Sequence, residues 1–141
     1  MTREESIKLL ALIKVAYPTA YKDMDRETKL ATVNMWQMSF PTVPYVIMEM
    51  AFNSFRLKSK YPPTVAEMVD ELRNSYYSAV LNANVAQGMG DSDTYRRCLY
   101  VMDHTSRFRD SNDSVNYGGI SEAMLSAHEE RAMLTEGDTA W

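Results

Sequence analysis

The side chains in this chain that could do acid–base, nucleophilic or metal chemistry are few and scattered. Asp103 and His104 are adjacent and could form an acid–base pair, but neighbouring residues of a helix point in different directions and no nucleophile accompanies them. The other histidine, His128, is isolated, and the single cysteine, Cys98, has no partner for a disulfide or a zinc site. We therefore interpret Asp103 and His104 as solvated surface and Cys98 as a small packing residue.

The sequence also lacks the glycine-rich phosphate-binding loop that is typical of proteins that hydrolyse ATP or GTP. The chain has five glycines, and none leads into the Gly-Lys-Ser/Thr ending of a phosphate-binding loop. We expect a protein that is not an enzyme and that uses no cofactor and no metal ion.

Single-stranded nucleic acid could stack on the aromatic residues Trp36, Tyr45, Tyr76 and Tyr77. Because they lie at helical spacing beside Leu and Met, we interpret them as core residues instead. Charge supports a protein partner over DNA: residues 1–80 have a net charge of +1 and residues 81–141 a net charge of −5. An acidic distal half opposes non-specific binding to phosphates.

Apolar residues recur at helical spacing and no stretch alternates as a strand would, so the predicted fold class is all-α. Local signals set the helix ends. The first helix should begin at a capping box of Thr2 and Glu5 and end at Tyr17-Pro18. The second should begin at Asp25 and end at Pro41. The third should begin at Thr42–Pro44, with Pro44 in its first turn.

A tight corner should follow the third helix. Pro62 and Pro63 cannot continue it, while Thr64 and Glu67 form a second capping box that starts a fourth helix. That helix either reaches Gly88–Gly90 or breaks near Asn74-Ser75, and Asp91 or Asp93 should cap a fifth. A helix-turn-helix that reads DNA is disfavoured, since the expected outward face carries three carboxylates; this face comprises Ala66, Glu67, Asp70, Glu71, Arg73 and Asn74.

We divide the chain into a helical domain (1–105), a polar linker (106–119) and an acidic, amphipathic C-terminal segment (120–141). An amphipathic helix after a linker suits docking into a partner's groove, and the alternative is that it folds back on its own domain. The expected partner-binding residues are Ile120, Met124, Leu125, Ala127 and Leu134. The sequence has no signal peptide, no run of apolar residues that could span a membrane, and one cysteine, which fits a reducing cytosol.

The stretch from about residue 4 to residue 72 resembles the phage-encoded replicative helicase loader and inhibitor family. The resemblance rests on the apolar first helix ending Ala16-Tyr17-Pro18, on Met50-Ala51, on the run Tyr61–Met68, and on the signature residues Trp36, Pro44, Tyr45, Pro62, Pro63, Thr64 and Glu67. It covers about half of the chain, and the Pro-Pro-Thr corner is its most specific part.

The resemblance implies a compact helical N-terminal domain with a mobile C-terminal segment. It also implies a non-enzymatic adaptor that binds a hexameric replicative helicase, holds it inactive without an ATPase of its own, and delivers it to an origin-binding replication protein. The expected location is the cytoplasm of an infected or lysogenic bacterial host, with no membrane contact and no direct sequence-specific DNA binding. Two other functions remain open, a phage assembly chaperone and a small DNA-binding regulator.

Overall fold

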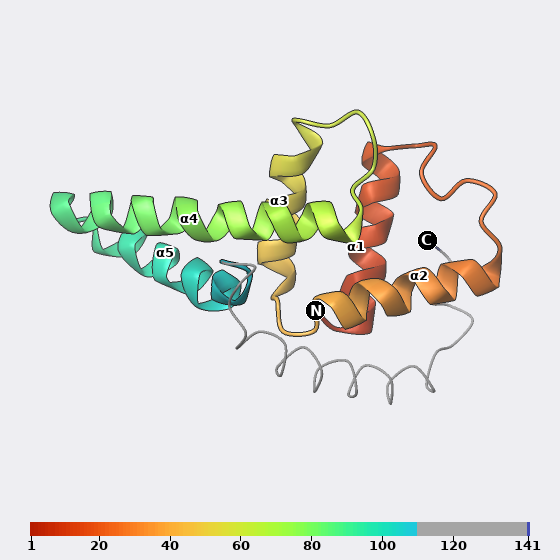
Figure 1. Cartoon of the computed structure of the whole chain (residues 1–141), viewed down its shortest axis with the longest axis horizontal. Coiled ribbons are helices and arrows are strands. Elements are labelled where there is room, and N and C mark those ends of the chain that lie inside the picture. The colour runs from red at the N-terminus through yellow and green to blue at the C-terminus, as the bar shows by residue number, and fades with distance from the viewer. Residues whose placement is uncertain (110–140) are drawn as a thin grey trace.

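The computed structural model describes residues 1–109 and residue 141. All regular secondary structure in this part of the chain is helical, with no strand, as the sequence predicted. Helices α1, α2 and α3 and the first half of α4 form a bundle, while the second half of α4 and α5 extend from it as a hairpin (Figure 1). The elements are α1 (Arg3–Ala16), α2 (Arg26–Ser39), α3 (Tyr45–Arg56), α4 (Val65–Met89), α5 (Ser92–Thr105) and the short 3-10 helix η1 (Ser106–Phe108).

The predicted helix starts are confirmed at four positions. Thr2 and Thr64 each form a full capping box, in which the threonine hydroxyl accepts from the N3 backbone amide and the N3 glutamate accepts from the threonine amide. Asp25 and Asp91 each accept from a backbone amide three residues on, so Asp91 and not Asp93 caps α5. These caps satisfy backbone donors that a helix cannot satisfy by itself.

The start of α3 differs by one residue from the prediction. Pro44 is the N-cap and Tyr45 is the first helical residue, with no side-chain cap. Proline is suited to this place because its fixed φ angle, −60° here, is compatible with the turn into the helix. The N-terminus holds the loop between α2 and α3 in place, because the amino group of Met1 donates to the carbonyl oxygens of Phe40 and Val43 at 2.9 and 2.7 Å.

The main core lies where α1, α2, α3 and the first half of α4 meet. The first helix is central, as its apolar sequence predicted: Leu9, Leu10 and Ile13 are completely buried. The other large side chains of this core are Val33, Trp36, Phe40, Ile47, Met48, Phe52, Met68 and Leu72. Burial of such residues is the principal favourable term in folding.

Helix α4 is continuous through Asn74 and Ser75, so the alternative of a break there is wrong. It ends at Gly90, whose φ of +72° gives the left-handed cap that glycine adopts without strain. Beyond the main core, Ala79 and Ala83 of α4 pack against Cys98 of α5. These small side chains let the two helices approach closely, and Cys98 is the packing residue that the sequence predicted.

The packed structure extends past Thr105, where the polar linker was expected to begin. Phe108 of η1 is 7% exposed, and its ring centroid lies 6.3 Å from that of Phe40 in the main core. Residues 106–109 therefore pack against the helical domain, and the remaining part of the expected linker, 110–119, lies outside the described residues.

Candidate partner-binding surfaces

The expected partner-binding residues Ile120, Met124, Leu125, Ala127 and Leu134 lie outside the described residues, as does His128. The structure instead describes the residues on either side of positions 110–140. Arg109 precedes these positions and Trp141 follows them, and both make contacts with the helical domain.

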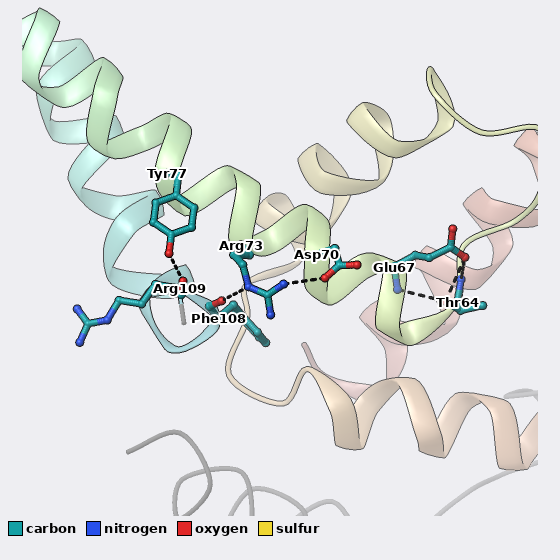
Figure 2. A network of polar contacts seen from close by, with 7 residues as sticks. All are labelled: Thr64, Glu67, Asp70, Arg73, Tyr77, Phe108 and Arg109. Carbon is teal, nitrogen blue, oxygen red and sulfur yellow. Dashed lines mark hydrogen bonds and ion pairs between the residues drawn. The ribbon is translucent and has the colours of Figure 1, made fainter. Parts of the chain in front are cut away.

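A row of polar contacts along α4 holds the last residues of η1 and Arg109 in place (Figure 2). Arg73 donates from Nε to the carbonyl oxygen of Phe108 at 2.9 Å and from Nη1 to Asp70 Oδ1 at 2.7 Å. One turn further along, the hydroxyl of Tyr77 donates to the carbonyl oxygen of Arg109. Two α4 side chains thus hold two consecutive carbonyl groups at the end of η1.

The turn that leads into the Pro-Pro corner contacts the end of α1, which lies more than 40 residues earlier in the chain. The hydroxyl of Tyr17, at the end of α1, donates to the carbonyl oxygen of Ser59 at 2.9 Å. Burial raises the pKa of Tyr17, while nearby Arg56 acts to lower it. A shallow hollow of about 500 Å³ lies here, lined by residues from both segments, namely Ala16, Tyr17, Pro18, Thr19, Arg56, Ser59, Lys60, Tyr61 and Pro62.

Glu71 does not lie on the outward face of α4, where the sequence placed it. Its side chain is 9% exposed and its Oε1 lies 2.5 Å from Nζ of Lys58. The prediction was wrong because helical periodicity does not reveal that the turn after α3 covers this side of α4. Two carboxylates of the predicted set remain exposed, those of Glu67 and Asp70, and both are engaged within the domain.

The aromatic residues divide between core and surface. Trp36 is 2% exposed and belongs to the main core, as predicted, while Tyr45 is half-buried under the ammonium group of Lys8 at 4.6 Å. Tyr76 and Tyr77 contact each other edge to face at 5.4 Å. The core interpretation is wrong for Tyr77, which is 48% exposed and whose hydroxyl donates to the carbonyl oxygen of Arg109.

Tyr77 begins an apolar stripe along the outer face of α4. The stripe consists of Tyr77, Leu81, Val85 and Met89, spaced four residues apart and all exposed. No charged residue occurs between positions 74 and 90. The i, i+4 spacing was visible in the sequence, but α4 has a second apolar row, Ala79, Ala83 and Ala86, and the sequence alone did not show which row α5 covers.

A groove of about 520 Å³ lies between α3, α4 and α5. Its lining includes the apolar residues Met50, Ala79, Cys98 and Val101 together with the charged residues Lys58, Glu71 and Arg97. No histidine lines it. The ring of His104 packs against that of Tyr100 at 4.5 Å, and Asp103 is exposed. The geometry therefore assigns Asp103 and His104 no shared site with a nucleophile.

Neither a metal centre nor a membrane span occurs in the described part of the chain. Within residues 1–109 and 141, no three His, Cys, Asp or Glu side chains gather as metal ligands. None of the described helices has the length and apolar character needed to cross a bilayer.

Comparison with known families decides the relationship of the N-terminal part. Residues 1–69 match the family model for the N-terminal domain of the gp39P-type phage helicase loader and inhibitor. The matched residues are just under half of the chain, and over them the chain is similar to this family. The match covers α1 to α3, the Pro-Pro corner and the first turn of α4, and it confirms the resemblance that the sequence showed. No curated protein and no solved structure matched the chain in the other two comparisons.

Most of α4 and the whole of α5 and η1 lie beyond the matched residues. The apolar stripe and the contacts that hold Phe108 and Arg109 are therefore features of the part outside the family match.

Proposed function

We propose that this protein is a non-enzymatic phage DNA-replication adaptor that binds a hexameric replicative helicase, holds it inactive and delivers it to an origin complex. The observation that carries the proposal is the family match over residues 1–69. The fold is consistent with an adaptor, because its helices form a packed core that can carry a binding surface.

The helicase contact is assigned to the C-terminal segment. Ile120, Met124, Leu125, Ala127 and Leu134 supply apolar anchors, and a few such anchors carry most of the binding energy in protein interfaces. The domain holds Phe108 and Arg109, which precede these anchors in the chain, through Arg73 and Tyr77.

The protein acts through binding and without nucleotide turnover of its own. Its site of action is the cytoplasm of an infected or lysogenic bacterial host, where the helicase is found, and its second partner is an origin-binding replication protein. No cofactor and no sequence-specific DNA contact are required in this scheme.

Co-purification with the replicative helicase, followed by assays of helicase ATPase and unwinding, tests the proposal. The full-length protein should be recovered with the hexamer and should suppress unwinding. A variant with Ile120→Ser, Met124→Ser and Leu134→Ser should lose both effects. The matched control is Leu81→Ser with Val85→Ser, which removes exposed apolar groups from the stripe on α4 and should bind normally.

Loss of binding in the Leu81→Ser, Val85→Ser variant, with normal binding in the triple variant, would place the helicase contact on α4. It would overturn the assignment to the C-terminal segment. Absence of any helicase complex would overturn the adaptor function itself. In that case, recovery of a virion structural protein would identify an assembly chaperone, and a mobility shift of DNA that persists at moderate salt would identify a DNA-binding regulator.

A further inference from the structure

Trp141 is buried against the N-terminal half of the domain although it follows α4 by more than 50 residues in the chain. It is 6% exposed and belongs to the main core cluster. Its ring meets the ring of Tyr21 edge to face, with centroids 5.0 Å apart. The ammonium group of Lys29 lies 5.4 Å from the Trp141 ring centroid and also donates to the Trp141 carbonyl oxygen at 2.8 Å.

The loop between α1 and α2 provides the other side of this contact. Tyr21 and Asp23 have φ angles of +60° and +62°, a conformation that residues other than glycine rarely adopt. Backbone of this kind persists where surrounding contacts hold it and is common at binding sites. The Tyr21 side chain is partly buried, and this burial raises the pKa of its phenol to about 12.

We propose that the α1–α2 loop, together with Lys29, is a binding site for a large aromatic side chain, and that Trp141 occupies it as an intramolecular latch. We call this site, formed by Tyr21 and Lys29, the indole seat. It holds Trp141 against the N-terminal domain, while Arg73 and Tyr77 hold Phe108 and Arg109, so the residues on both sides of positions 110–140 contact the domain.

The contacts define what the indole seat recognises. Tyr21 presents a ring to the indole, and Lys29 provides a cation near that indole and a donor to the main-chain oxygen of Trp141. The site therefore contacts both the aromatic ring and the main chain of Trp141. The indole Nε1 is buried and has no hydrogen-bond partner among the described residues. The seat therefore selects for the aromatic ring and not for the indole N–H, and phenylalanine should partly replace tryptophan.

Charge favours the latched arrangement. Residues 110–140 contain seven Asp or Glu and a single Arg, whereas residues 1–109 contain 14 Lys or Arg and 12 Asp or Glu. The acidic segment is thus attached to a domain of slight positive charge, and the cation Lys29 lies at the point where Trp141 docks.

Tryptophan fluorescence of the full-length protein tests the latch directly. The chain has two tryptophans, Trp36 in the core and Trp141 in the seat, and both should be shielded from acrylamide in the wild type. Trp141→Ala supplies the signal of Trp36 alone. Tyr21→Ala should shift part of the emission to longer wavelength and make about half of it quenchable, since one of two indoles is released.

Three further variants make the test specific. Lys29→Ala removes the cation and the carbonyl contact without opening a core cavity, and it should also increase quenching if Tyr21→Ala fails to fold. Trp141→Phe should retain the melting temperature better than Trp141→Ala does. Tyr61→Ala removes an exposed tyrosine elsewhere and should leave the tryptophan emission unchanged. A wild-type protein with one freely quenched tryptophan, or emission that neither Tyr21→Ala nor Lys29→Ala changes, would overturn the latch.

A regulatory consequence follows, and it rests on the proposed helicase function. If the latch restrains the segment, helicase binding should expose Trp141 to quencher, and Trp141→Ala should bind the helicase severalfold more tightly because no latch must open. Equal or weaker affinity would show that the latch does not compete with the helicase. The two proposals fail separately, because the fluorescence test needs no helicase and the co-purification needs no tryptophan signal.

Discussion

Glu71 of α4 is buried and forms an ion pair with Lys58, the second residue after the end of α3, across a distance of 2.5 Å between Oε1 and Nζ. The pair is asymmetric: 55% of the Lys58 side chain is exposed, against 9% of the Glu71 side chain. It joins the turn after α3 to α4, at a point seven residues beyond Thr64 of the capping box. Three features therefore hold the corner in place: the fixed φ angles of the two prolines, the capping box and this ion pair.

The asymmetry of this pair predicts unequal effects of removing its two partners. Lys58→Ala leaves a buried carboxylate without its cation and should lower the free energy of unfolding by about 1–2 kcal/mol. Glu71→Gln should cost less, because a neutral amide needs no counter-charge and the freed ammonium group is hydrated. Chemical denaturation of both single variants and the double variant measures the coupling. A larger loss for Glu71→Gln than for Lys58→Ala would show that other groups stabilise the Glu71 carboxylate.

The capping box at the corner gives a second prediction. Thr64→Ala removes the acceptor for the Glu67 amide and should cost about 0.5–2 kcal/mol, while Glu67→Ala should cost less. Ser78→Ala, at an exposed position in the middle of α4, is the matched control and should have little effect, since alanine is the better helix former. Thermal unfolding followed by circular dichroism distinguishes these variants. An unchanged melting temperature for Thr64→Ala would mean that the box contributes nothing to stability.

Phe108 provides a test of where the folded domain ends. Its ring packs on Phe40, so Phe108→Ala should destabilise the domain by about 3 kcal/mol, the lower end of the range for such truncations because η1 lies at the edge of the core. Leu99→Ala, which shortens a partly exposed apolar side chain on α5, should cost much less. Denaturant titration of the two variants gives the comparison. Equal small losses would indicate that residues 106–109 behave as a linker in solution.

The parts of the fold that could be predicted from the sequence depend on local chemistry. Thr2, Thr64 and Asp25 cap helices through groups within three residues of themselves, and Gly90 ends α4 through its own backbone freedom. These features need no knowledge of the tertiary structure, and for that reason the all-α class and the helix starts followed from the sequence.

The features that the sequence could not provide depend on contacts between distant segments. Glu71 and Tyr77 lie on α4 at positions whose exposure is decided by the turn after α3 and by α5. Phe108 is an isolated aromatic residue in a polar stretch, so no periodicity marks it as core. Nothing in the sequence around Trp141 marked it as a core residue either. The site that it occupies depends on the backbone conformation at Tyr21, which no motif predicts.

The phenol of Tyr21 gives the last prediction, which concerns alkaline pH. Burial raises its pKa from 10.0 to about 12 in the folded protein, whereas the unfolded chain ionises near the ordinary value. Between these two values the unfolded state releases a proton that the folded state keeps. The stabilising contribution is therefore complete below pH 10 and is lost as the pH rises towards 12. Tyr21→Phe cannot ionise and should lose less stability over this interval than the wild type.

Urea unfolding at several pH values between 9 and 12 is the measurement, on the wild type, Tyr21→Phe and Tyr61→Phe, the last removing an exposed phenol as a control. Trp141→Ala should resemble Tyr21→Phe in this interval, because loss of the covering indole hydrates the phenol and brings its pKa back towards 10. Identical pH dependence for Tyr21→Phe and the wild type would contradict the burial of Tyr21. A Trp141→Ala profile like that of the wild type would instead show that the loop, and not Trp141, shields the phenol.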